Sequence, residues 1–176
     1  MKIEKLLTEA QIQARVEEMA QEISRDFPQT NKAGKPPVAL ILANGAIFFA
    51  ADLLRKLRFE TEIQVVRVAS YAGTQSNGAP EIVGGISPEK FRGRNVLVID
   101  DVLDTGHTLA KVREHLCAAG AEDVRICVLL DKPSRRVVPG QADYVGFSID
   151  DVFVVGYGLD LDDAWRTLPY VGIVKE

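Results

Sequence analysis

The stretch VLVIDDVLDTGHTL, Val96 to Leu109, decides how this sequence is interpreted. Its first four residues are apolar and predict a strand that is buried on both faces. Two carboxylates, Asp100 and Asp101, follow directly. A turn of small and hydroxyl residues then opens a helical pattern that runs from Thr108 to Ala118. A strand, a polar turn and a helix in this order are typical of a βαβ unit, in which ligands bind at the carboxyl end of the strand.

The turn, Asp104 to Thr108, is suited to bind an anion. Backbone N–H groups at a helix start point at one spot, which favours a phosphate, and Gly106 permits close approach of the backbone. The two adjacent carboxylates suit a ribose diol or Mg²⁺, and Asp104 stands where it could accept a proton. Taken alone, Asp104 could be a helix N-cap and Asp100 and Asp101 a solvated turn. Their combination with the apolar run and D-T-G-x-T favours a ligand site.

Outward from this stretch, short apolar runs alternate with helical stripes. We expect further strands at Val38–Ala43, Glu62–Ala69, Val124–Leu130, Tyr144–Phe147 and Val152–Val155, and helices at 8–27 and Ile47–Leu57. The first helix has a capping box, Thr8 with Gln11, and an apolar stripe of Ile12, Val16, Met19, Ile23 and Phe27. This alternation predicts an α/β fold with a mainly parallel sheet flanked by helices. The long polar segment Ser70 to Pro80 predicts a lid, because it follows the carboxyl end of a strand.

The composition limits the class of protein. A length of 176 residues with 47% hydrophobic and 26% charged residues predicts one globular domain. A net charge of −4 and the lack of a basic arm argue against nucleic acid as a partner. The sequence has no apolar run near the ~20 residues that span a bilayer and no signal peptide, so we expect a cytoplasmic protein without a membrane partner. We expect Cys117 and Cys127 to be small core residues.

Five motifs in order resemble the type I phosphoribosyltransferases, and more narrowly the hypoxanthine and hypoxanthine-guanine phosphoribosyltransferases. They are LANGAIFFAADL (Leu42 to Leu53), ASY (Ala69 to Tyr71), IDDVLDTGHTL (Ile99 to Leu109), LLDKPSRR (Leu129 to Arg136) and FVVGYGLD (Phe153 to Asp160), followed by Trp165-Arg166. The resemblance runs from about Val38 to the C-terminus. It implies a single domain over 1–176 with a Rossmann-like core at about 38–140, a small hood from about 1–37 and 141–176, and a lid at about 70–80.

The resemblance implies an enzyme of purine salvage, a Mg²⁺-dependent pentosyltransferase that assembles as a homodimer or homotetramer. Its substrates would be phosphoribosyl pyrophosphate and a 6-oxopurine, hypoxanthine and also guanine, and its products IMP or GMP and pyrophosphate. Bond breaking at the sugar carbon would lead, and the lid would exclude water.

The resemblance also implies a role for each matching residue. Asp104 would be the general base that takes a proton from the purine. Phosphoribosyl pyrophosphate would contact Asn44, Gly45, Ser70, Tyr71, Asp100, Asp101, Asp104, Thr105, Gly106, His107, Thr108 and Arg166. The purine would contact Lys132, Phe153, Val154 and Asp160, with Lys132 donating to the C6 oxygen and Phe153 stacking on the base. Asp100, Asp101 and Asp160 would bind Mg²⁺.

Three positions depart from the family pattern. The first loop commonly carries Lys-Gly or Arg-Gly with an often cis peptide, whereas this sequence has Asn44-Gly45. Asn44 donates hydrogen bonds but brings no charge, which leaves both the cis geometry and a dimer contact open. Asp150 replaces a common proline and Leu161 a common aromatic residue. Because both flank the base pocket, the order of preference among hypoxanthine, guanine and xanthine is open.

Two alternatives use related features. A nucleotide-binding regulator on a phosphoribosyltransferase fold would share the phosphate loop, but the sequence has no basic patch and keeps the candidate base Asp104. A phosphorylated receiver domain also combines clustered acids with a lysine, but receivers carry an acidic pair after the first strand, where this sequence has Asn44-Gly45. The transferase is favoured over both.

Overall fold

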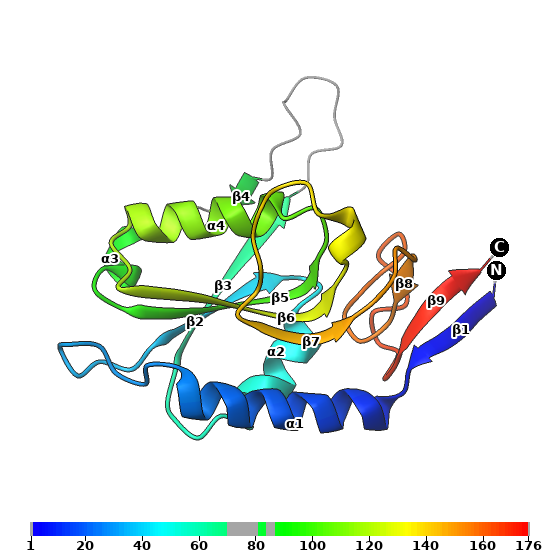
Figure 1. The fold of residues 1–176 in the computed structure, drawn as a ribbon, viewed down its shortest axis with the longest axis horizontal. Helices are drawn as coiled ribbons and strands as arrows, with labels where there is room; N and C mark the ends of the chain where they lie inside the picture. Colours follow the sequence, from blue (N-terminus) through cyan, green and yellow to red (C-terminus); the bar gives the residue numbers. More distant parts are fainter. Residues whose placement is uncertain (1, 70–80, 84–86, 176) are drawn as a thin grey trace.

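A six-stranded sheet forms the centre of the computed structural model, which describes residues 2–69, 81–83 and 87–175 (Figure 1). The strand order is β4-β3-β2-β5-β6-β7, with β2 at Val38–Ala43, β3 at Glu62–Ala69, β4 at Glu81–Val83, β5 at Asn95–Leu103, β6 at Asp123–Asp131 and β7 at Tyr144–Ser148. Five strands are parallel, and β4 runs antiparallel to β3. The predicted α/β fold with a mainly parallel sheet is confirmed.

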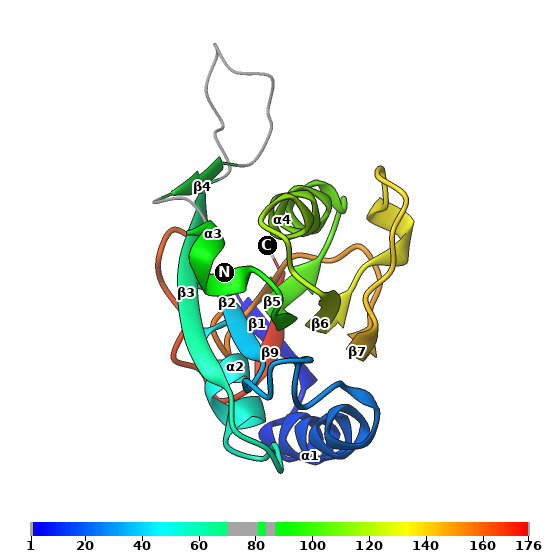
Figure 2. The ribbon, with the colours of Figure 1, turned by 90° about the vertical axis from the view of Figure 1, so that its left-hand side faces the viewer.

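Helices cover both faces of this sheet (Figure 2). Helices α1 (Glu9–Asp26) and α2 (Ile47–Leu54) lie on one side, and α3 (Pro88–Phe91) and α4 (His107–Ala118) lie on the other. The sheet divides the core into two clusters, because alternate side chains of β2 point to opposite faces: Ala39 and Ile41 pack on the first side, Leu40 and Leu42 on the second. Within the described part of the chain, no helix is both long and apolar enough to cross a bilayer.

The first helix forms as its sequence predicts. The Thr8 hydroxyl accepts from the Gln11 backbone N–H, and the Gln11 side chain accepts from the Thr8 backbone N–H. The predicted stripe from Ile12 to Phe27 is buried. Helix α2 is shorter than predicted and ends at Leu54. The chain then continues in tighter turns, in which the N–H groups of Lys56 and Leu57 donate to the carbonyls of Leu53 and Leu54.

A second, antiparallel sheet joins the two ends of the chain. Its order is β1-β9-β8, with β1 at Lys2–Leu7, β9 at Val171–Lys175 and β8 at Val154–Val155. Strands β1 and β9 bring the two ends of the chain side by side (Figure 1), and neither strand was predicted. The strand predicted at Val152–Val155 keeps only its last two residues. These short strands depend on partners that are distant in sequence.

The main sheet extends past residue 140, because strand β7 pairs with β6, and α1 packs against α2 and β7. We call the second sheet, with the loops between β7 and β9, the hood. The predicted lid at about 70–80 lies outside the described residues.

The two cysteines differ. Cys127 is buried in β6, as predicted, but Cys117 is exposed, so that prediction was wrong. The reason is helical geometry: its neighbour Leu116 is on the buried face of α4, and one residue turns the side chain by about 100°.

Asp52 connects the core to the hood. Its Oδ2 atom accepts from the Tyr157 hydroxyl and from Gln13 Nε2, both at 2.6 Å. Burial would raise the pKa of Asp52, but these hydrogen bonds and one from Arg55 outweigh it and lower the pKa. The contact fixes the start of the hood loop that carries Asp160.

Candidate active site

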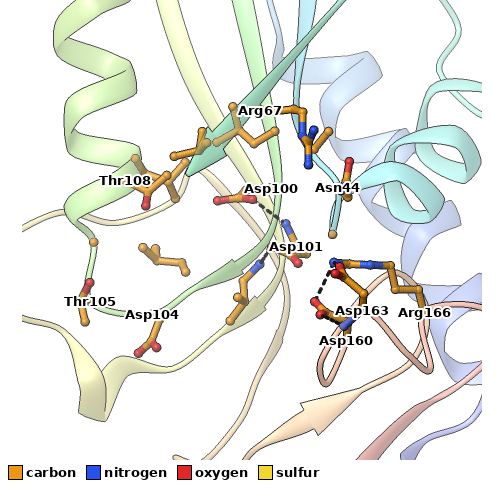
Figure 3. Close-up of a pocket in the computed structure, with 18 of the residues that line it drawn as sticks. Asn44, Arg67, Asp100, Asp101, Asp104, Thr105, Thr108, Asp160, Asp163 and Arg166 are labelled. Atoms are coloured by element: carbon orange, nitrogen blue, oxygen red, sulfur yellow. Dashed lines mark hydrogen bonds and ion pairs between the residues drawn. The ribbon is translucent and has the colours of Figure 1, made fainter. Parts of the chain in front are cut away.

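A cleft of about 1200 Å³ lies across the carboxyl ends of the central strands (Figure 3). It is lined by the end of β2, the end of β3, the β5–α4 turn and the hood loop around Asp160. Ten of the predicted site residues meet here: Asn44, Gly45, Asp100, Asp101, Asp104, Thr105, Gly106, Thr108, Asp160 and Arg166. Because they come from three separate segments of the chain, only the fold brings them together.

Asp100 and Asp101 belong to β5 rather than to a turn after it. Strand β5 pairs with β2 only up to Ile99 but continues along β6 to Leu103. The two acids therefore stand just beyond the last residue of β5 that pairs with β2. Burial raises the pKa of both carboxyls, that of Asp100 most, and the neighbouring charge of Asp101 raises the pKa of Asp100 further. Folding thus holds two acids in a position that disfavours their ionisation.

The loop after β2 lies directly against this acidic pair. A Cβ atom at Gly45 would overlap the carboxylate of Asp101, and a Cβ atom at Gly158 would overlap the carbonyl oxygen of Gly45. Only glycine allows the β2 loop, β5 and the hood to approach this closely. The Ala43–Asn44 peptide is cis, so the cis geometry left open by the sequence is present although Asn44 replaces the common basic residue.

The β5–α4 turn presents its N–H groups to the cleft. The carbonyls of Asp104 and Thr105 are occupied, because they accept from the Arg136 side chain and from the N–H groups of Val137 and Val138. Among the described residues, no acceptor meets the N–H groups of Thr105, Gly106, His107 and Thr108.

Helix α4 starts immediately after this turn. Gly106 is its N-cap in the left-handed conformation, with φ of 91°. Asp104 is therefore not the N-cap of α4, which excludes the purely structural role that its sequence position also allowed. A turn of this kind at a helix start suits an anion.

The segment after β6 joins Asp104 to the candidate purine residues. Arg135 Nε donates to Asp104 Oδ1 at 3.0 Å, and Arg135 Nη1 lies 3.6 Å from Asp151 Oδ2. Lys132 Nζ donates to the Val152 carbonyl at 2.8 Å. The Phe153 ring is 53% exposed. The fold thus gathers the predicted base-binding residues beside Asp104, although Lys132, Phe153 and Val154 do not line the main cleft.

Arg166 organises the hood loop. Its Nη2 atom lies 2.9 Å from Asp160 Oδ1 and 3.2 Å from Asp163 Oδ1, and its Nη1 atom donates to the Gly158 carbonyl at 2.8 Å. Asp160 also accepts from the Asp163 backbone N–H. Arg166, which was predicted to contact phosphoribosyl pyrophosphate, is therefore already engaged by two acids of its own loop.

Some sequence predictions remain outside this site. Ser70 and Tyr71 lie outside the described residues. His107 is exposed and is not part of the lining, so only its backbone N–H fits the predicted role. Arg67, from β3, lines the cleft and was missed. Its only sequence signal was its position three residues before the predicted lid.

The carboxylates suit a metal that arrives with a ligand. Among the described residues, no three His, Cys, Asp or Glu side chains are grouped to hold an ion by themselves. Mg²⁺ is usually bound by one or two carboxylates together with phosphate oxygens and water. The Asp100–Asp101 pair and Asp160, on two sides of one anion-binding cleft, fit this mode of binding.

The chain is similar to known proteins over nearly its whole length. The family model described as "Phosphoribosyl transferase domain" matches residues 2–162. The hypoxanthine phosphoribosyltransferase of Salmonella typhimurium is 39% identical over 172 residues, covering 98% of this chain and 95% of that protein. A crystal structure of a hypoxanthine-guanine phosphoribosyltransferase from Bacillus anthracis has a TM-score of 0.89 at 36% identity, covering 99% of this chain and 100% of that one.

A third similar protein was solved with a nucleotide. It is a mutant hypoxanthine phosphoribosyltransferase from Trypanosoma cruzi complexed with the product IMP. Its TM-score is 0.88 at 30% identity, and the match covers 99% of this chain and 91% of that chain.

The raised pKa of Asp100 predicts that its charge costs stability at neutral pH. The folded state binds the proton of Asp100 more tightly than the unfolded state does. The contribution of this proton to the free energy of unfolding is therefore complete at low pH and is lost as pH rises through the pKa of the folded state. Asp100→Asn, which stays neutral, should raise Tm at pH 7.5 in EDTA by at least about 2 °C. The gain should vanish below about pH 4, near the ordinary pKa of an aspartate.

Thermal unfolding followed by circular dichroism across pH measures this effect. Asp162→Asn, at an exposed loop position, is the matched control and should leave Tm nearly unchanged. A lower Tm for Asp100→Asn at pH 7.5 would contradict the prediction.

Proposed function

The chain belongs to the phosphoribosyltransferase family as a hypoxanthine(-guanine) phosphoribosyltransferase of purine salvage, and from this premise we propose its reaction. Ribose 5-phosphate moves from phosphoribosyl pyrophosphate to hypoxanthine, and also to guanine, which gives IMP or GMP and pyrophosphate. One observation carries the proposal: Thr105, Gly106 and Thr108, whose N–H groups meet no acceptor among the described residues, line the same cleft as Asp100 and Asp101. An anion site beside acceptors for a diol is the pattern that a ribose phosphate requires.

The phosphate loop and the acidic pair bind the sugar. The N–H groups of Thr105, Gly106, His107 and Thr108 donate to the 5′-phosphate. Asp100 and Asp101 accept from the ribose hydroxyls, which are donors. Because these groups belong to β5 and to the start of α4, the reacting sugar carbon is held by two rigid elements.

At the other end of the substrate, Asp160, Asp100 and Asp101 would hold Mg²⁺ through their carboxylate oxygens. The ion would supply positive charge that stabilises the leaving pyrophosphate. Arg166 holds the Asp160 carboxylate in place at 2.9 Å and adds positive charge beside the pyrophosphate. A protein with a net charge of −4 thereby binds two anionic groups through local donors and a cation.

Asp104 acts as the general base. Arg135 holds one of its oxygens, Oδ1, at 3.0 Å, which orients the carboxylate and leaves Oδ2 to accept the proton of the purine ring. The side chain is 38% exposed, so a base can reach it.

The purine occupies the space between the Asp104 loop and the segment at 152–154. The exposed ring of Phe153 stacks on the base, and the backbone of Val154 contacts its edge. Lys132 is already directed to this place by its bond to the Val152 carbonyl, and it donates to the C6 oxygen of the base. The same donor disfavours adenine, because the C6 amino group of adenine offers no acceptor to the Lys132 ammonium.

We also propose that the chain forms a homodimer or homotetramer. Ile47 and Phe48 of α2 are 46% and 41% exposed, and Ile63 and Val65 of β3 are 54% and 57% exposed. In register with Ala39 and Ile41, the two β3 side chains point to the same side of the sheet as α2. An apolar face of this kind is typical of an interface.

The first test is substrate choice. Steady-state rates with phosphoribosyl pyrophosphate, Mg²⁺ and each of hypoxanthine, guanine, xanthine and adenine should show use of 6-oxopurines and little use of adenine. Lys132→Gln should lower kcat/KM for hypoxanthine roughly 10- to 100-fold, since it removes one charged hydrogen bond. Lys90→Gln, on the exposed side of α3, serves as control. Equal rates with adenine and hypoxanthine would overturn the assignment.

The second test concerns Asp104. Asp104→Asn keeps the shape but removes the proton acceptor, so kcat should fall about 10²- to 10⁴-fold while KM for phosphoribosyl pyrophosphate changes little. Asp123→Asn makes the same change at the amino end of β6 and should keep the kcat of the unaltered protein. Near-full kcat in Asp104→Asn excludes this residue as the base.

The third test measures assembly. Sedimentation equilibrium should give a mass of two or four chains, and Val65→Glu should shift it towards one chain, because a charge in an apolar contact costs several kcal/mol. The control Lys90→Glu places the same acid on α3, away from that face. A monomer for the unaltered protein contradicts the proposal.

A further inference from the structure

Among the described residues that line the cleft, Arg67 is the one cation that the proposed reaction leaves unused. It lies near the end of β3, and its partner in the parallel register with β2 is Ala43, the residue before Asn44. Neighbouring strands are about 4.8 Å apart, so Arg67 begins next to the β2 loop. Figure 3 shows its guanidinium directed towards Asn44. Arg67 thus brings a positive charge to the place where this chain lacks the family's common Lys or Arg.

The charge balance of the cleft makes this cation significant. The described lining contains six carboxylates, at Asp100, Asp101, Asp104, Asp160, Asp162 and Asp163, and two cations, Arg67 and Arg166. Arg166 is engaged by two of these acids and by a carbonyl. No acid among the described residues lies within ion-pair distance of Arg67. Its donors therefore remain available for an anion from outside.

The position of Arg67 identifies which anion it meets. In Figure 3 the phosphate loop, with Thr105, and the β2 loop, with Asn44, lie at opposite ends of the cleft, and Asp100 and Asp101 lie between them. The 5′-phosphate is proposed to occupy the first end. A group attached to the other side of the ribose extends towards Asn44 and Arg67.

We infer that Arg67 binds the pyrophosphate group of phosphoribosyl pyrophosphate and supplies from β3 the charge that Asn44 does not bring from the β2 loop. This inference rests on the proposed function. A guanidinium binds phosphate oxygens through two parallel N–H donors, and these charge-assisted bonds are about twice as strong as neutral ones. Asn44 keeps a hydrogen-bonding role, and the positive charge has moved to the neighbouring strand.

Isothermal titration calorimetry with Mg²⁺ tests this inference through three ligands: phosphoribosyl pyrophosphate, inorganic pyrophosphate and ribose 5-phosphate. Arg67→Gln should weaken the binding of phosphoribosyl pyrophosphate and of pyrophosphate about tenfold or more, since a tenfold change corresponds to one charged contact. The affinity for ribose 5-phosphate should change by less than about twofold. In the steady state, KM for phosphoribosyl pyrophosphate should rise more than kcat falls. Arg92→Gln, an exposed arginine outside the cleft, is the matched control.

A rescue experiment separates a charge effect from a structural one. Asn44→Arg in the Arg67→Gln background should recover most of the lost pyrophosphate affinity, while circular dichroism and sedimentation should show the same fold and assembly for all variants. Unchanged pyrophosphate affinity in Arg67→Gln, or equal weakening of ribose 5-phosphate, would overturn the inference, and so would a double variant that recovers nothing. If the unaltered protein binds none of the three ligands, the proposed function itself fails.

Discussion

The site depends on the point at which the pairing of two neighbouring strands stops. Strand β5 pairs with β2 as far as Ile99 and then continues along β6 to Leu103. This step leaves one side of β5 open to the cleft, and Asp100 and Asp101 occupy these positions. Without this step in the sheet, the same acids would face a paired strand, and an unpaired charge there would be far more costly.

The step is maintained by close backbone contacts. Gly45 lies against Asp101 and Gly158 lies against Gly45, so any side chain at either position would separate the β2 loop from β5 or from the hood. The hydrogen bond from Tyr157 to Asp52 anchors the same hood loop to α2. The acids of β5 and Asp160 of the hood therefore keep a fixed relation, which a substrate with two anionic ends requires.

The acidic residues of the cleft serve the function of the site but lower the stability of the folded state. Burial and mutual repulsion raise the pKa values of Asp100 and Asp101, and acids exceed cations along the described lining. An anionic substrate enters such a cleft only when positive groups accompany it. The positive groups are the backbone N–H groups of the β5–α4 turn, Arg166, and a metal of the kind that the carboxylates suit. Arg67 adds a further positive charge near the β2 loop. The site is thus complementary to its ligand rather than stable by itself.

Much of the fold was readable from the sequence, because its signals are local. The continuous apolar runs of β2, β5 and β6 indicate strands buried on both faces, and the Thr8–Gln11 box with its apolar stripe indicates α1. The short terminal strands β1 and β9 escaped prediction, since β1 pairs with β9 at the other end of the chain and β9 lies between β1 and β8. Cys117 was misplaced because a stripe predicts the buried face of a helix but not which flanking residues it leaves exposed.

For the site, the sequence alone indicated a turn at Asp104–Thr108 that suits a phosphate, an acidic pair, and the family to which these motifs belong. Which groups meet depended on the tertiary structure. It placed Arg135 on Asp104, Lys132 beside Val152 and Arg166 on Asp160, and it brought Arg67 next to Asn44 through the β2–β3 register. The physical reason is that a motif is a property of neighbouring residues, whereas the balance of charge in a cleft depends on side chains that the sheet assembles from distant ones.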